Sequence, residues 1–144
     1  MDPVKFRSRR GIESFLQEDW IKFLNGRGWM TERLVGNAMQ KGLPDIFAHH
    51  PKHGSRWIDF KVLQKYEYTK AQIRTWPLWE SYGLGVYIIA GTCKHPDFEE
   101  MDREYQVLFG PPNFRKYWKP KYNKMIPTEA DIDNLLDQLA KESE

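Results

Sequence analysis

The chain has 144 residues, which is enough for one domain with a substantial hydrophobic core. A formal net charge of +2 excludes a strongly basic or acidic protein. The single cysteine, Cys93, excludes an internal disulfide and fits a reducing compartment. The N-terminus has no secretory-type apolar run, and the longest apolar run, residues 86–90, is too short to span a bilayer. We therefore expect an intracellular, cytoplasmic protein without a membrane partner.

In chain order, the first predicted element is an amphipathic helix from about residue 12 to residue 25, ended by Asn25-Gly26. A strand over 29–35 and a loop over 36–42 follow it. The helix carries its bulky apolar residues at helical spacing on one face. They are Ile12, Phe15, Leu16, Trp20, Phe23 and Leu24.

Two apolar strands, near 45–50 and 56–62, are separated by a short stretch of turn residues and therefore predict a hairpin. The hairpin places Asp45 and Asp59 on neighbouring strands. Side chains alternate between the two faces of a strand, so Asp59 and Lys61 point the same way. Two carboxylates within reach of one divalent cation, with an ammonium group beside them, favour phosphodiester hydrolysis.

This interpretation rests on the ligand preferences of metal ions. Carboxylate oxygens suit Mg²⁺, which keeps some of its waters and takes other ligands from phosphate. A lysine beside the metal positions a water and offsets charge on the phosphoryl transition state. The alternative for Asp59 is an ion pair with Lys61 or Arg56, because an acid on a half-buried strand needs a partner. The alternative for Asp45 is an ordinary turn residue after proline.

A second helix is predicted from Thr69 to about residue 82, broken or kinked at Pro77, which lacks an N–H group and crowds the preceding turn. Its first residues form a capping box, in which the Gln72 side chain bonds back to the backbone N–H of Thr69. A buried strand over 85–91 follows.

Beyond residue 91 the sequence predicts a further strand over 105–109, then a loop rich in proline, lysine and aromatic residues, then a final amphipathic helix capped by Thr128. The apolar stripe of this helix is a candidate dimer interface, or it packs on its own domain. The stripe comprises Ile132, Leu135, Leu136 and Leu139.

Three histidines, His49, His50 and His53, lie in the predicted hairpin loop. Cys93 and His95 have no recognised zinc-ligand spacing with them, so a solvated or DNA-facing loop is favoured over a metal site.

The distribution of charge predicts where a nucleic acid would lie. Cations gather in residues 1–12 and 113–124, whereas acids dominate residues 128–144. The segment 113–122 interleaves cations with aromatic residues, which neutralise phosphates and stack on unpaired bases. In the alternative, its aromatic residues pack into the core. The predicted DNA contacts are Arg7, Arg9, Arg10, Lys65, Lys70, Arg115, Lys116, Trp118 and Lys119.

Together these features resemble the PD-(D/E)XK nuclease superfamily, and most of all its small virus-type replication and repair nuclease (VRR-NUC) domains. The resemblance covers about residues 12–91 and implies an α/β, restriction-endonuclease-like αβββαβ core with a central mixed sheet flanked by helices. This chain would add a C-terminal loop and helix, over about 92–144, within a single domain. This branch more often has glutamate where the chain has Asp59. The matching positions are Glu13 and Gln17, Gly42 to Asp45, Asp59 with Lys61, and Gln72.

The resemblance implies a Mg²⁺-dependent DNA endonuclease in which Mn²⁺ substitutes. Asp45, Asp59 and the backbone carbonyl of Phe60 would bind the metal, and Lys61 would position the attacking water. The products would carry a 5′-phosphate and a 3′-hydroxyl.

Two further positions are implied by the resemblance. Glu13 would complete the metal shell, although an acid in a first helical turn is also favoured by the helix dipole. Asp19 is the rival acid on the same helix. Gln72 would orient the water or a phosphate, which competes with its place in the capping box.

Small stand-alone enzymes of this branch look like homodimers that cut branched DNA such as Holliday junctions, which implies a two-fold dimer encoded by a virus and acting in the host cell. The alternatives are a sequence-specific or end-acting nuclease of the same fold, a DNA-binding module without the chemistry, and a structural protein.

Overall fold

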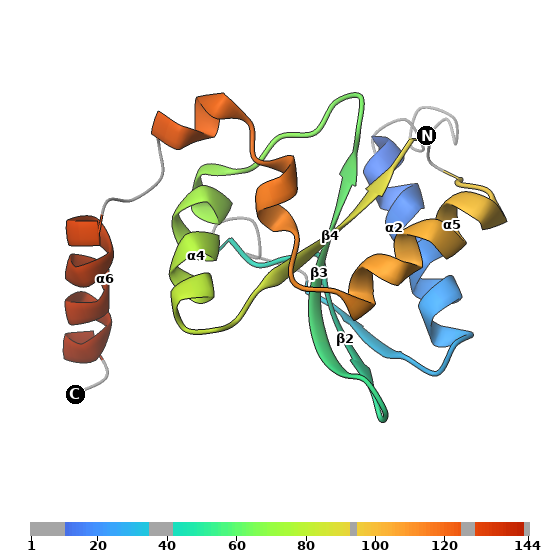
Figure 1. Ribbon diagram of the computed structural model, residues 1–144, viewed down its shortest axis with the longest axis horizontal. Coiled ribbons are helices and arrows are strands. Elements are labelled where there is room, and N and C mark those ends of the chain that lie inside the picture. Colours follow the sequence, from blue (N-terminus) through green and yellow to red (C-terminus); the bar gives the residue numbers. More distant parts are fainter. Residues whose placement is uncertain (1–10, 35–41, 93–94, 125–128, 143–144) are drawn as a thin grey trace, which may run out of the picture.

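The computed structural model describes residues 11–34, 42–92, 95–124 and 129–142 of the chain. The element order α-β-β-β-α-β is the predicted one, and the hairpin is confirmed (Figure 1). These elements are α2 (Gly11–Asn25), β1 (Met30–Arg33), β2 (Ile46–His50), β3 (Gly54–Val62), α4 (Lys70–Ser81) and β4 (Val86–Gly91).

The strands form one mixed sheet in the order β1-β2-β3-β4. Strand β2 is antiparallel to both β1 and β3, whereas β4 runs parallel to β3. Pairing between β2 and β3 reaches only as far as Ile46 opposite Ile58, whereas β3 continues beside β4 to Val62 opposite Gly91. The last residues of β3 therefore have β4 along one edge and no continuing β2 along the other.

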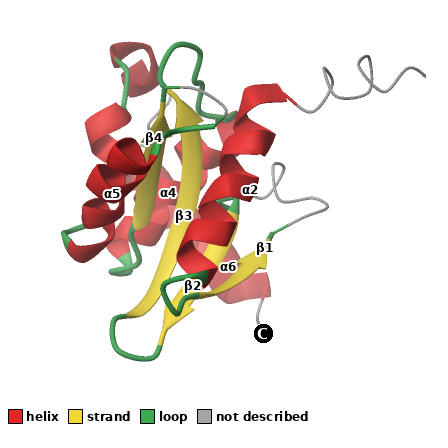
Figure 2. Cartoon of the chain, turned by 90° about the vertical axis from the view of Figure 1, so that its right-hand side faces the viewer, coloured by secondary structure: helices red, strands yellow, loops and turns green. Residues whose placement is uncertain are grey.

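Helices cover both faces of the sheet. Helices α2 and α5 (Phe98–Tyr105) lie on one face and α4 lies on the other, as Figures 1 and 2 show. Alternate residues of β3 divide between the two faces, so the molecule has two cores. The first core contains Leu16, Trp20, Leu24, Ile58, Phe60, Ile89 and Leu108, and the second contains Tyr68, Ile73, Trp76, Val86, Ile88, Phe114 and Tyr122.

The strand predicted over 105–109 is wrong. The chain there forms the end of α5 and a 3₁₀ helix, η1 (Gln106–Phe109). Asp97 caps α5 by accepting a hydrogen bond from the Glu100 backbone N–H at 2.8 Å, and the acids Glu99 and Glu100 complement the helix dipole. These local helix signals outweigh the short apolar run in η1, where Leu108 is buried in the first core.

The part of the C-terminal extension from Phe114 to Lys124 packs on the opposite face. The 3₁₀ helices η2 (Phe114–Tyr117) and η3 (Pro120–Lys124) bury Phe114 and Tyr122 in the second core. The extension therefore contributes buried residues to the cores on both faces of the sheet.

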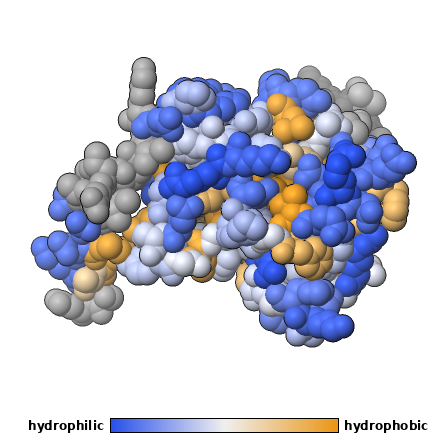
Figure 3. All heavy atoms as spheres, in the orientation of Figure 1, coloured by the Kyte–Doolittle hydropathy of each residue, from blue (hydrophilic) through white to orange (hydrophobic). Residues whose placement is uncertain are grey.

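The final helix is confirmed as α6 (Glu129–Glu142), and its predicted cap, Thr128, lies outside the described residues. On the face seen in Figure 3, hydrophilic side chains predominate and hydrophobic ones gather in small areas, one of them on α6.

Helix α4 runs through Pro77 without interruption, so the predicted break there is wrong. Proline inside a helix costs about 3 kcal/mol, because one backbone hydrogen bond is lost and the ring crowds the preceding turn. Ile73, Trp76 and Leu78 are buried on either side of Pro77 and hold the helix in place. Among the described residues, no helix has the length and apolar character needed to cross a membrane.

Candidate metal and phosphate site

The turn from Gly42 to Asp45 is fixed against α4. Gly42 has a φ of +72°, and a Cβ added there would lie 2.6 Å from the backbone oxygen of Ala71. The Gly42 carbonyl accepts a hydrogen bond from the Trp76 indole N–H at 2.6 Å, and Pro44 is buried. Glycine is therefore required at position 42, and α4 determines where Asp45 lies.

We expect Gly42→Ala to lower the free energy of unfolding more than Gly83→Ala does. Both glycines have positive φ, so alanine at either site adds about 1–2 kcal/mol of backbone strain. At Gly83 nothing lies within 4 Å of the added Cβ, whereas at Gly42 the turn must move away from Ala71. Urea denaturation of both variants measures the difference. Equal losses would show that the turn does not depend on its contact with α4.

Asp45 directly precedes β2 and binds the backbone of β3, beyond the last residue pair that joins the two strands. Its Oδ2 accepts a hydrogen bond from the Phe60 N–H at 2.9 Å. The N–H and C=O of one strand residue point to the same edge, so the Phe60 carbonyl also faces Asp45. The predicted neighbourhood of Asp45, Asp59 and the Phe60 backbone is therefore present.

Asp59 and Lys61 form a buried ion pair. The two residues are 1% and 4% exposed, and Lys61 Nζ lies 2.9 Å from Asp59 Oδ2. The ammonium also donates to the Glu67 carbonyl at 3.0 Å and to Gln72 Oε1 at 3.3 Å, so each of its three N–H groups has an acceptor in reach. The alternative predicted for Asp59, a pair with Lys61, is thus observed. Arg56 instead donates to the Leu108 carbonyl.

Burial raises the pKa of the Asp59 carboxyl, and the charge of Lys61 and contacts with Asp45 oppose that rise. Although Asp59 Oδ2 lies beside Lys61, it accepts no well-aligned hydrogen bond from the described residues. The ion pair with Lys61 offsets part of the cost of burying this carboxylate, and a bound metal cation would offset more of it. The donor set of two carboxylates and one backbone carbonyl is of the kind that Mg²⁺ binds.

Gln72 caps α4 as predicted, and it also contacts Lys61. Its backbone N–H donates to Thr69 Oγ1 and its Oε1 accepts from the Thr69 N–H, each at 3.1 Å, so the capping box is confirmed. The same Oε1 accepts from Lys61 Nζ. Helix capping therefore fixes the side chain that holds the lysine.

Sequence reasoning missed the role of residues 66–68, the segment that covers Lys61. The ammonium lies 4.9 Å from the centroid of the Tyr68 ring, a favourable cation–π distance, and burial raises the pKa of Tyr68. The Tyr68 N–H donates to the Tyr122 hydroxyl at 3.1 Å, and Lys121 Nζ lies 2.6 Å from Glu67 Oε1. Because the contacts with Lys121 and Tyr122 join residues more than fifty positions apart, no local pattern in the sequence predicts them.

Helix α2 lies on the face of the sheet opposite to Asp59 and Lys61. Glu13 belongs to this helix, and its side chain is outside the described part of the structure. Asp19, the rival acid, places Oδ2 2.7 Å from His95 Nδ1 and so binds a partner on the α2 side.

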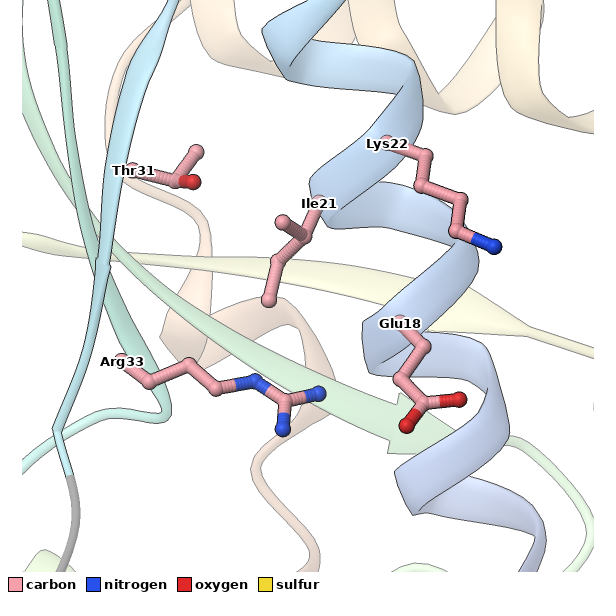
Figure 4. Close-up of a pocket in the computed structure, with 5 residues that line it drawn as sticks. All are labelled: Glu18, Ile21, Lys22, Thr31 and Arg33. Carbon is pink, nitrogen blue, oxygen red and sulfur yellow. The ribbon is translucent and has the colours of Figure 1, made fainter.

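A surface hollow of about 460 Å³ lies between α2 and β1 (Figure 4). In Figure 4 the Glu18 carboxylate and the Arg33 guanidinium point toward one another across it, whereas Lys22 points away. The charges of Glu18 and Arg33 offset each other, so the hollow does not favour an anion over a cation.

The predicted DNA contacts differ in their surroundings. Arg7, Arg9 and Arg10 lie outside the described residues, whereas Lys65, Lys70 and Lys116 are exposed. Arg115 is paired with Glu80 at 2.9 Å, and Lys119 donates to the Tyr66 carbonyl at 2.9 Å. Trp118 packs against the second core, its ring centroid 5.0 Å from that of Tyr68. For Phe114, Trp118 and Tyr122 the structure therefore shows the alternative, packing into the core.

The hairpin histidines contact one another and aromatic side chains. His50 and His53 have ring centroids 4.5 Å apart, and His53 also contacts Trp29 and Phe109. Partial desolvation and the charges of His50, Lys52 and Arg56 lower the pKa of His53. Across the described ranges, no three or more His, Cys, Asp or Glu residues gather in a way that could hold a metal ion. Cys93 lies outside these ranges.

Comparison of the chain with protein-family models, with curated proteins and with solved structures found no match.

Proposed function

We propose that this protein is a metal-dependent DNA endonuclease of the PD-(D/E)XK type. The observation that carries the proposal is that Asp45, Asp59 and Lys61 lie together where the pairing between β2 and β3 stops. The αβββαβ order and the mixed sheet agree with the restriction-endonuclease-like core that the motifs imply. Asp45, Asp59 and the Phe60 carbonyl would hold Mg²⁺, and Mn²⁺ would substitute.

The bound metal would polarise a phosphoryl oxygen and lower the pKa of a water. Lys61 would remain anchored by the Glu67 carbonyl and Gln72 when the Asp59 carboxylate turns toward the cation. Its ammonium would then direct one N–H to the attacking water and stabilise negative charge on the phosphate. Gln72 and the segment 66–68 would keep it in that position.

The substrate that we propose is branched DNA, and the active form is a two-fold homodimer with one site in each subunit. DNA would approach over the exposed cations Lys65 and Lys70, which flank the segment covering Lys61. Glu13, on α2, would complete the metal shell.

The test is incubation of the protein with linear, nicked, flapped and four-way DNA in Mg²⁺, in Ca²⁺ and in EDTA. We expect Mg²⁺ to support cleavage that leaves a 5′-phosphate and a 3′-hydroxyl, most rapidly on branched DNA. Ca²⁺ should support binding but little cleavage, because its looser coordination organises the attacking water poorly.

Preferential cutting of linear ends or of one duplex sequence would support the nuclease activity and contradict the proposed branched substrate. Salt-sensitive DNA binding without cleavage in Mg²⁺ or Mn²⁺ would indicate a binding module that shares the arrangement and lacks the chemistry.

A further inference from the structure

A second hollow, of about 280 Å³, is lined only by aromatic and aliphatic side chains. Trp57 and Trp79 form its walls, with ring centroids 5.6 Å apart, and Phe47 lies behind Trp57 at 5.0 Å. Tyr82, at the rim, is 67% exposed. The lining residues are Leu43, Trp57, Trp79, Tyr82 and Leu84.

The hollow is preformed by the end of α4. The backbone N–H groups of Tyr82 and Leu84 both donate to the Trp79 carbonyl at 3.0 Å, which fixes the turn that carries the rim. An aromatic surface held open in this way is a favourable place for a flat apolar group to stack.

Two residues that line the hollow are near neighbours of the candidate metal ligands in the chain. Leu43 precedes Asp45 by two residues in the same turn. Trp57 precedes Asp59 by two residues on β3, so the two side chains share a face about 7 Å apart along the strand. A group bound in the hollow would therefore be one nucleotide or so from a phosphate bound at Asp45 and Asp59.

Positive charge lies along the same helix. Lys70 and Arg74 are exposed and one turn apart on α4, and within the described residues neither forms an ion pair that would neutralise it. About 18 Å of helix separates Lys70 from Tyr82. Exposed cations on the first turns of α4, with an aromatic hollow at its other end, match the chemistry of a nucleic-acid strand, because phosphates bind cations and bases stack on aromatic rings.

We propose that this hollow receives one unpaired nucleobase of the DNA substrate, while Lys70 and Arg74 bind the phosphates of the same strand. This inference rests on the proposed nuclease function and specifies its substrate as DNA with an extrahelical or unstacked base. The lining offers no charged group for reading a base edge, so the stacking is tolerant of sequence.

The experiment compares a duplex that carries a bulged 2-aminopurine with the same duplex fully paired, both bound in Ca²⁺ without Mg²⁺. Stacking on an aromatic side chain quenches 2-aminopurine fluorescence. We expect Tyr82→Ala to weaken binding of the bulged DNA about 5- to 30-fold and to remove the quenching, with little change on the paired duplex. Tyr82→Phe should keep both the affinity and the quenching.

Phe98→Ala is the matched control, because Phe98 is an aromatic residue of almost equal exposure, 66%, on the opposite face of the sheet. It should leave both DNA affinities unchanged. Equal losses on bulged and paired DNA, or none in Tyr82→Ala, would overturn the inference. A change in the oligomeric state of Tyr82→Ala without a change in DNA binding, measured by analytical ultracentrifugation, would also overturn the inference. It would indicate that the hollow is a protein interface.

Failure of the nuclease proposal is distinguishable from failure of this inference. Wild-type protein that cuts bulged and paired DNA equally well, with Tyr82→Ala unaffected, overturns the inference and supports the nuclease. Wild-type protein that cuts no DNA in Mg²⁺ overturns the proposed function, whereas Tyr82-dependent quenching of the bulged base in Ca²⁺ would still support the hollow as a base-binding site.

Discussion

Asp59→Asn should abolish DNA cleavage while leaving DNA binding intact or tighter. The substitution removes one of the two carboxylates proposed to hold the metal, and it removes a negative charge beside the phosphate. We expect the single-turnover rate in Mg²⁺ to fall by at least about 100-fold. Binding measured in Ca²⁺ should not weaken. A variant with full activity would refute the assignment of Asp59 as a metal ligand.

The same substitution should also destabilise the fold, so cleavage must be compared where both proteins are folded. Lys61 would lose its buried counter-charge and keep the acceptors on Glu67 and Gln72. Breaking a buried ion pair costs about 3–5 kcal/mol, and the amide oxygen of asparagine should hold the loss near the lower value. Circular dichroism during thermal unfolding gives the temperature range in which the rates are comparable.

Lys61→Met should lose most turnover and keep metal affinity. Methionine fills the volume of the lysine stem in this buried position and removes only the ammonium. We expect the cleavage rate to fall by about 100-fold, because the charge that stabilises the transition state is absent. The metal takes over the positive charge beside Asp59, so Mn²⁺ binding should persist. A loss of metal affinity as large as the loss of rate would place Lys61 in a metal-supporting role.

Thermal stability offers a second measurement on Lys61→Met. Without metal, Asp59 is left as a buried carboxyl without its counter-charge, and the variant should unfold at a lower temperature than the wild type. Mg²⁺ should raise the unfolding temperature more in the variant than in the wild type, because a ligand that binds only the folded state stabilises it. Lys70→Met, at an exposed lysine that begins α4, is the matched control and should change neither temperature.

The elements that carry the site were predictable from the sequence because their signals are local. Alternation in β3 places Asp59 and Lys61 on one face, and the Thr69–Gln72 capping box starts α4, and both features are present. The apolar run Val86–Gly91 forms the fully buried strand β4.

The remainder depends on contacts between distant residues. The strand expected over 105–109 is instead helical, because the Asp97 cap and its acids start a helix that continues to that point. Trp118 was predicted to stack on DNA, and its place against Tyr68 follows from the folding of the extension onto the second core. The aromatic hollow likewise gathers residues from a turn, a strand and a helix end.

The most direct test of the account is titration with Mn²⁺, with free Mn²⁺ measured by electron paramagnetic resonance in the presence of duplex DNA. The wild type should bind Mn²⁺ at the site, and Asp19→Asn should bind it equally, because Asp19 is engaged with His95 on the α2 side. Asp45→Asn and Asp59→Asn, both shown to be folded, should each lose this binding. Unchanged Mn²⁺ affinity in both variants would contradict the claim that Asp45 and Asp59 together hold a catalytic metal.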